Sequence, residues 1–216
     1  MEMRYWARGE GDRIFVDNRI LCRTDNEELT GHLKREFEDV QGEWFGELFY
    51  LRKLENLLKN YGYEISNYAP FFNPSRTKEI PKEHESHLTF YYGDEIKQFK
   101  EDERFQESFL YGDIDPDKIG VSYQIGDTIV GMAGANYNGK YVWEIGIEVF
   151  DGYRGQGLAP VLVSAITNRI VKENNGGIIP TYGTRFTHTK SMNVAIRSGY
   201  KIGWTELMIK KKEHHK

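Results

Sequence analysis

The stretch between residues 141 and 170 constrains the fold most, because it changes from strand to helix across one short turn. From residue 141 to 150, apolar residues alternate with polar or small ones, as in a strand with one buried face. Three glycines follow within residues 151–159. From residue 158 to 170, apolar residues recur at helical spacing. The sequence therefore predicts a strand that passes through a glycine-rich turn directly into an amphipathic helix.

A turn of this kind can bind a phosphate or pyrophosphate. Glycines let backbone N–H groups point to one spot without Cβ atoms in the way, and the helix that starts near Gly157 adds the positive end of its dipole. Pro160 falls in the first helical turn, where its missing N–H costs nothing, and Arg154 adds a positive charge. A dinucleotide-binding fingerprint would need glycine at residue 160, and no P-loop Gly-Lys-Ser/Thr is present. An ordinary strand-to-helix turn would carry the same glycines, so both interpretations stay open at this point.

The other segments of the second half of the chain alternate short strands with helices. Gly126 and Asp127 separate two apolar runs, which is a β-hairpin signal. Residues 174–177, Asn-Asn-Gly-Gly, end the helix that follows the turn. We expect strands at 87–92, 119–125, 129–137, 178–182 and 200–209, a broken helix at 94–110 and a regular helix at 188–198.

The N-terminal part of the chain has a helical pattern with no chemical motif. An apolar face recurs at spacings of three and four, formed by Leu29, Leu33, Phe37, Val40, Trp44, Leu48 and Leu51. Asp25 or Asn26 is placed to cap its start, and Gly42 and Gly46 predict either one kinked helix or two short ones. We also expect a hairpin at 13–22, an extended segment at 63–72 and a charged linker at 75–85.

Charge and cysteine content exclude several classes of protein. Twenty-nine basic and 33 acidic residues give a net charge of −4, whereas a nucleic-acid-binding protein carries a basic surface. No apolar run is long enough for a membrane helix, and the first residues lack the apolar stretch of a signal peptide. The single cysteine, Cys22, cannot form an internal disulfide, so we expect a reducing compartment, the cytoplasm.

The turn and its surroundings resemble the GNAT superfamily of N-acetyltransferases. Residues 154–159 match the acyl-CoA loop Arg/Gln-x-x-Gly-x-Gly/Ala of that family, residues 144–149 resemble its fourth strand, and residues 191–200 resemble its closing helix with the following Gly-Tyr. The resemblance implies an α+β fold: a mixed, mainly antiparallel twisted sheet flanked by helices. We expect a mostly helical N-terminal region at 1–85, the GNAT-like domain at 86–210 and a basic tail at 211–216, similar to a bacterial subgroup with an added N-terminal region.

The resemblance also implies which residues bind acetyl-CoA, the acetyl donor. The loop would bind the pyrophosphate of CoA, and the pantetheine arm would pair with the strand backbone near Ile147 and Val149, where Gly146 allows a close approach. His188 and Ser191 stand where the family often has an Asn-x-x-Ser pair. The loop residues are Arg154, Gly155, Gln156, Gly157, Leu158 and Ala159.

The catalytic residues are less fully defined by the resemblance. Glu144 matches a strand glutamate that many family members carry, and it would accept the proton of the amine directly or through water; a solvated strand position is the alternative. Glu148 is expected to be structural, because it lies roughly 13 Å from Glu144 along the strand. Ala195 stands where the family often has a tyrosine that protonates the leaving thiolate. Tyr182, Ser191, Tyr200 or His188 is an alternative acid, or no acid is needed.

The expected function is acetyl transfer from acetyl-CoA to a primary amine of a small molecule or peptide, by direct attack and without a metal. A non-catalytic acyl-CoA-binding or regulatory module is the alternative. We expect neither nucleic acid nor membrane as a partner, and a monomer or homodimer.

Overall fold

The computed structural model of the protein describes residues 12–16 and 19–212. The chain divides into two compact units. Among the described residues, 72–201 form the first unit, and all others form the second. No helix in the described part of the chain is both long and apolar enough to cross a bilayer.

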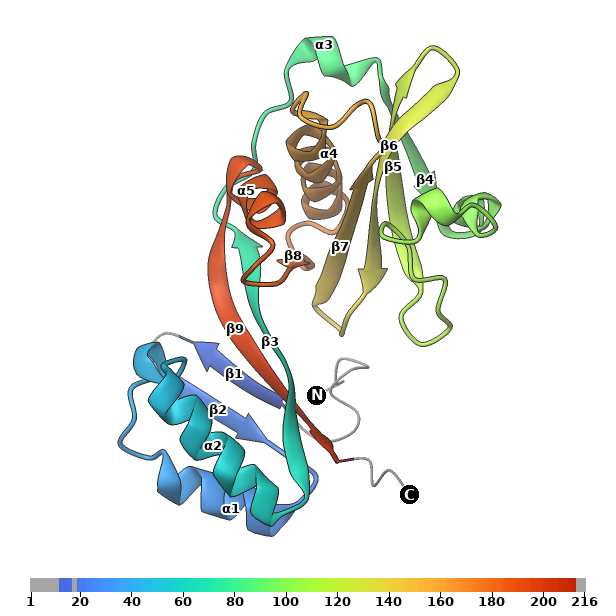
Figure 1. Ribbon diagram of the computed structural model, residues 1–216. Coiled ribbons are helices and arrows are strands. Elements are labelled where there is room, and N and C mark those ends of the chain that lie inside the picture. Colours follow the sequence, from blue (N-terminus) through green and yellow to red (C-terminus); the bar gives the residue numbers. More distant parts are fainter. Residues whose placement is uncertain (1–11, 17–18, 213–216) are drawn as a thin grey trace. The chain divides into compact units, whose positions relative to one another are not determined.

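The first unit is built on a mixed sheet, which Figure 1 shows in green to brown. Its strands run in the order β8-β7-β6-β5-β4, antiparallel from β4 to β7 and parallel between β7 and β8. Gly126, with φ of 58°, forms the two-residue turn between β5 and β6. The strands are β4 (Leu88–Tyr92), β5 (Asp117–Ile125), β6 (Thr128–Tyr137), β7 (Val142–Val149) and β8 (Ile179–Gly183). This sheet confirms the predicted α+β, mainly antiparallel fold class.

Different elements cover the two faces of this sheet. On one face, helix α4 (Leu158–Glu173) packs its apolar side, which includes Leu162 and Ile166, against alternate residues of β5, β6 and β7. On the other face lie the 3₁₀ helices η3 (Gly93–Phe99) and η4 (Glu103–Phe105), which form a separate aromatic cluster with Met132. The unit is completed by the short helix α3 (Lys82–Glu85) and by α5 (Thr189–Arg197). The predicted broken helix at 94–110 is therefore two 3₁₀ turns.

The second unit has its own apolar core. Helices α1 (Glu27–Glu36) and α2 (Leu48–Asn60) are joined through η2 (Gly42–Trp44), so the predicted helical face is two short helices. Asn26 caps α1, since its side chain accepts a hydrogen bond of 3.0 Å from the Leu29 N–H. Strands β1 (Asp12–Val16) and β2 (Arg19–Arg23) pair as predicted, while their turn, residues 17–18, lies outside the described residues.

Two long strands belong partly to each unit. Strands β3 (Tyr63–Pro74) and β9 (Tyr200–Lys211) cross from one unit to the other along the chain. Leu207 and Ile209 of β9 are buried in the core of the second unit together with leucines of α1 and α2. The division therefore falls near residue 71 and again near residue 201, not at residue 85, because the apolar end of β9 completes the core of the second unit.

Candidate active site

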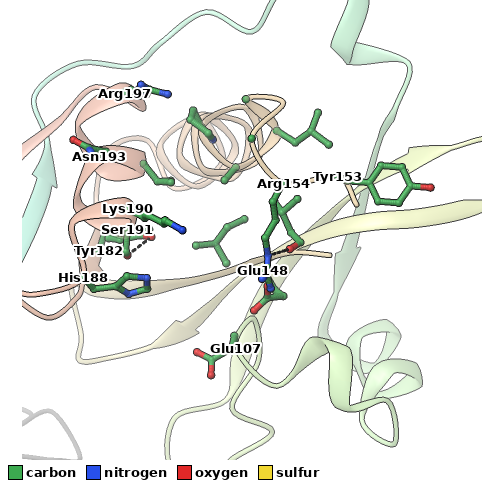
Figure 2. Close-up of a pocket in the computed structure, with 18 of the residues that line it drawn as sticks. Glu107, Glu148, Tyr153, Arg154, Tyr182, His188, Lys190, Ser191, Asn193 and Arg197 are labelled. Atoms are coloured by element: carbon green, nitrogen blue, oxygen red, sulfur yellow. Dashed lines mark hydrogen bonds and ion pairs between the residues drawn. The ribbon is translucent and has the colours of Figure 1, made fainter. Parts of the chain in front are cut away.

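A cavity of about 1110 Å³ lies within the first unit (Figure 2). Its walls come from the C-terminal part of β7, the turn that follows, the first turn of α4, the end of β8, and α5 with the loop before it. Glu107, in the segment after η4, completes the lining. The cavity therefore contains the strand–turn–helix junction that the sequence singles out.

The cavity begins where β7 and β8 stop pairing. Their parallel register runs through three pairs and ends at Glu144 and Thr181. Beyond that point Ile147 and Val149 of β7 and Tyr182 of β8 line the cavity. Within the described residues, no strand pairs with β7 on this side after residue 144. This part of β7 thus presents a strand edge to the cavity, at the two residues where pairing with the pantetheine arm is predicted.

The turn after β7 has backbone N–H groups without an acceptor in the described part of the protein. Gly155 and Gly157 have φ of 82° and 83°, a left-handed conformation that favours glycine, and Gly157 is the N-cap of α4. Among the described residues, no oxygen accepts a hydrogen bond from the amides of residues 155–159. These amides and the α4 dipole together form a site suited to an anion.

Most of the predicted loop residues line the cavity. Arg154, Gly155, Gly157, Leu158 and Ala159 do so. Gln156 is not part of the lining, and its side-chain amide donates to the Gly152 carbonyl at 3.2 Å. That contact holds the turn together.

The guanidinium of Arg154 binds the turn to β7. It donates to the Val149 carbonyl at 2.7 Å and forms ion pairs with Glu148 at 2.7 Å and Asp151 at 2.8 Å. The hydrogen bond to Glu148, followed by the charges of the two carboxylates, raises the pKa of Arg154. Because both carboxylates offset its charge, Arg154 shapes the turn more than it attracts an anion. The ion pair of Glu148 with Arg154 agrees with a structural role, although Glu148 also lines the cavity.

Three other cations face the cavity, and the sequence reasoning did not identify them. They are Arg185 in the loop after β8 and Lys190 and Arg197 of α5. None of them has an ion pair within 4.0 Å among the described residues, which leaves their charges available to an anionic ligand. Lys190 and Arg197 are seven residues apart, two helical turns, so this spacing on α5 was the available signal.

His188 and Ser191, the predicted pair at the start of α5, both line the cavity. His188 is the N-cap residue of α5, but its side chain makes no capping hydrogen bond. The hydroxyl of Ser191 lies 2.8 Å from the hydroxyl of Tyr182, as Figure 2 shows. Burial raises the pKa of Tyr182, and the hydrogen bond with Ser191 partly opposes that effect.

The candidates for proton transfer occupy different places. Tyr200 hydrogen-bonds Thr167 in the interior and does not line the cavity, and Ala195 is fully buried. Glu144, the predicted base, is also outside the lining, and its carboxylate accepts a hydrogen bond from the Asn138 side chain. Glu107 does line the cavity, although the sequence reasoning did not select it.

The family model described as "Acetyltransferase (GNAT) family" matches residues 80–200, more than half of the chain. The chain belongs to the GNAT acetyltransferase family. Acetyl transfer from acetyl-CoA is the general reaction of that family. The predicted resemblance to this family is confirmed, and the matched residues include the whole cavity lining.

Solved GNAT structures share the fold at low sequence identity. A GCN5-related N-acetyltransferase from Kribbella flavida has a TM-score of 0.52 and 13% identity, covering 97% of this chain and 92% of its own. A GNAT acetyltransferase from Colwellia psychrerythraea has a TM-score of 0.52 and 12% identity, covering 88% and 76% respectively. No curated protein matches the chain. The comparisons therefore establish family and fold.

Proposed function

We propose that this GNAT protein transfers the acetyl group of acetyl-CoA to a primary amine of a small molecule or peptide. The observation that carries the proposal is the combination of an anion-binding turn with an unpaired strand edge in one cavity. Acetyl-CoA contains both a pyrophosphate, which the turn is suited to bind, and an arm with amide groups, which the strand edge is suited to bind.

The turn is assigned to the pyrophosphate. The amides of residues 155–159 have no acceptor among the described residues, and an anion at the start of α4 is stabilised by the helix dipole. Arg185, Lys190 and Arg197 add positive charge on the α5 side of the cavity. The residues present therefore fit a ligand with several phosphate groups.

The edge of β7 is assigned to the pantetheine arm. Ile147 and Val149 pair with β6 on one side, but no described strand pairs with them on the β8 side, so an extended ligand with amide groups can pair there as an added strand does. The Val149 carbonyl already accepts from Arg154, which leaves the backbone of Ile147 as the main pairing position. From the turn, an arm along this edge leads back toward residue 146, just beyond the last β7–β8 pair at Glu144. The thioester is therefore expected at that end of the cavity.

Tyr182 is assigned to the leaving thiolate. It is the phenol that lines the cavity from β8, and Ser191 orients its hydroxyl. Its raised pKa favours the protonated form, which is the form that donates a hydrogen bond to sulfur. Tyr182 would thus replace the tyrosine that the family often has at the position of Ala195.

The expected reaction is direct transfer. The donor supplies an acetyl thioester, and the acceptor ammonium first loses one proton. The neutral amine nitrogen then forms the new C–N bond, the C–S bond breaks, and the second proton from nitrogen ends on the CoA sulfur, so one proton is released for each ammonium acetylated. Cys22, the only cysteine, belongs to the second unit and does not line the cavity. An acyl-cysteine intermediate is therefore not part of the proposal.

A non-catalytic acyl-CoA-binding module is the second candidate, favoured by two observations. Ala195 replaces the family tyrosine, and Glu144 lies outside the cavity lining. Such a module would keep the turn and the strand edge but lack turnover.

The test combines binding with turnover. Calorimetric titration of acetyl-CoA measures binding, and thiol release from acetyl-CoA is followed with tyramine, putrescine and glycinamide as acceptors. Binding together with amine-dependent thiol release supports the transferase. Binding without release on any amine supports the binding module, and an absence of binding contradicts both.

A further inference from the structure

Three glycines form a row across the sheet of the first unit. Gly120 of β5 pairs with Gly134 of β6, which pairs with Gly146 of β7. Side chains alternate between the two faces of a strand, and Ala133 and Ala135 beside Gly134 point toward α4. The row therefore leaves a strip without side chains on the face opposite α4.

Residues 107–109 lie directly on this strip. A Cβ atom at Gly134 would be 2.1 Å from the carbonyl oxygen of Ser108, and one at Gly146 would be 2.2 Å from that of Glu107. A Cβ atom added at Gly120 or at Gly134 would also lie 2.6 Å from a ring carbon of Phe109. The glycines thus let the backbone of residues 107–109 lie directly on the sheet. The close approach that was predicted for the pantetheine arm at Gly146 is made on this face by Glu107.

The segment is anchored beside and after Glu107. The Ser108 hydroxyl is buried and donates to the Met132 carbonyl at 2.8 Å, and Phe109 is buried as well. The N–H groups of Leu110 and Tyr111 donate to the Asp117 carboxylate at 3.1 and 2.8 Å. These contacts fix the backbone of Glu107, while its own side chain is exposed and faces the cavity.

Glu107 and Glu148 are the two acidic residues of the lining, and only Glu148 has an oppositely charged partner in the described structure. Glu148 is paired with Arg154, whereas no ion pair or hydrogen bond of the Glu107 carboxylate is found among the described residues. Arg185, Lys190 and Arg197 carry the opposite charge, and Figure 2 shows Glu107 on the side of the cavity away from Arg197. The cavity therefore has a cationic part and one unpaired carboxylate apart from it.

The position of Glu107 along the cavity matches the reacting end. Its carbonyl oxygen contacts Gly146, two residues beyond the last β7–β8 pair at Glu144. The anion-binding turn begins after β7 ends at Val149. An acceptor amine approaching a thioester near residue 146 would therefore meet the Glu107 side chain and not the phosphate-binding turn.

We infer that Glu107 binds the ammonium group of the acceptor and takes up its proton, which deepens the proposed function and rests on it. The carboxylate pairs with the ammonium, one proton moves from nitrogen to a Glu107 oxygen, and the neutral amine attacks the acetyl carbon. The C–S bond then breaks, and the second proton lost from nitrogen ends on the sulfur of CoA. Glu107 then returns the proton to water. Acceptors whose reacting amine is cationic in solution are the substrate class that this arrangement selects.

Glu107→Gln tests the inference, with Glu107→Asp as the conservative variant and Glu103→Gln as the matched control. Glu103 is an exposed glutamate of the same segment that does not line the cavity. We measure kcat/KM for tyramine and putrescine from pH 6 to 10, the calorimetric affinity for acetyl-CoA, and putrescine affinity with CoA present.

Removal of the carboxylate should lower kcat/KM for the amines about a hundredfold near neutral pH, the usual size of a general-base effect. The loss should shrink at high pH, where the amine deprotonates without help, and Glu107→Asp should retain part of the activity. Putrescine should bind more weakly to Glu107→Gln. The affinity for acetyl-CoA, and every value for Glu103→Gln, should stay at the wild-type level.

The failures of the two proposals are distinguishable. Wild-type turnover that Glu107→Gln leaves unchanged, with activity lost in Glu144→Gln, overturns the role of Glu107 and leaves the transferase standing. An equal loss in Glu107→Gln at every pH, with unchanged putrescine binding, also overturns it, since that is the pattern of a structural effect. A wild-type protein that binds acetyl-CoA but acetylates no amine overturns the proposed function and this inference together.

Discussion

Glycine serves opposite purposes in two regions of the first unit. In the turn after β7, Gly155 and Gly157 have positive φ and open space around them, so a Cβ atom would meet nothing within 4 Å. In the row across the sheet, Gly134 and Gly146 have no positive φ, but a Cβ atom would overlap backbone carbonyls. The first region needs glycine for the direction of its N–H groups, and the second needs it for close packing.

The difference separates the two halves of the proposed reaction. The turn presents backbone donors to an anion, and the row holds in place the segment that presents a carboxylate. Donor binding should therefore respond to changes in the turn, and amine turnover to changes in the row. Substitutions in each region test whether the two functions are separable.

The largest effect is expected from Gly157→Glu, which breaks the turn side of the comparison. A carboxylate at the N-cap of α4 would repel the pyrophosphate and would occupy a backbone position that disfavours a side chain. Calorimetry should detect no binding of acetyl-CoA. Gly126→Glu is the control, because Gly126 also has positive φ and open space but lies in the β5–β6 hairpin. Equal acetyl-CoA affinity in the two variants would refute the assignment of the turn.

The next effect is expected from Gly134→Ala, which breaks the row side. The added methyl group would overlap the Ser108 carbonyl and the Phe109 ring, and a backbone atom cannot move aside cheaply. We expect a loss of about 3 kcal/mol in the free energy of unfolding, the upper part of the usual range for overpacking. Urea denaturation measures it.

Gly112→Ala provides the matched control for the row, because nothing lies within 4 Å of its added methyl group and its φ is not positive. Its free energy of unfolding should stay within about 0.5 kcal/mol of wild type. If Gly134→Ala is as stable as Gly112→Ala, residues 107–109 do not lie on the sheet as described, and the position of Glu107 loses its support.

The smallest of these effects is expected from Tyr182→Phe, which sharpens the comparison by testing a side chain that belongs to neither glycine region. Loss of the hydroxyl should lower kcat severalfold, equivalent to about 1 kcal/mol, the net value of one hydrogen bond. Affinity for acetyl-CoA should change little.

The pKa of Tyr182 is raised above its ordinary value of 10.0, so its hydroxyl stays protonated at every pH up to 10.0. Deprotonation of Tyr182 should therefore cause no decrease in kcat at any pH below 10.0. A basic limb near pH 8 that disappears in Tyr182→Phe would contradict the assignment.

The two regions also differ in how far the sequence predicts them. The turn glycines are close in sequence and follow a strand pattern, so a short motif identified the turn and most of its lining residues. The row joins Gly120, Gly134 and Gly146, which only the register of three strands brings together. Glu107 was missed for the same reason, because its position depends on a contact with strands that come later in the chain.

Glu144 shows the limit of carrying a role across by position. The strand that carries it was predicted correctly, but its carboxylate accepts a hydrogen bond from Asn138, and the residue does not line the cavity. Neither fact can be read from spacing along one strand, since Asn138 reaches it from the neighbouring turn. The predicted boundary at residue 85 has the same limit. Leu207 and Ile209 are buried with leucines of α1 and α2, and a contact between residues so far apart in the sequence cannot be read from local patterns.

A crystal structure with bound acetyl-CoA tests the central claim most directly. The account predicts the pyrophosphate within hydrogen-bonding distance of the amides of residues 155–159, and the acetyl group beside Gly146 with Glu107 facing it. Acetyl-CoA bound outside this cavity, or in it with its thioester at the turn and its phosphates near Glu107, would contradict the account.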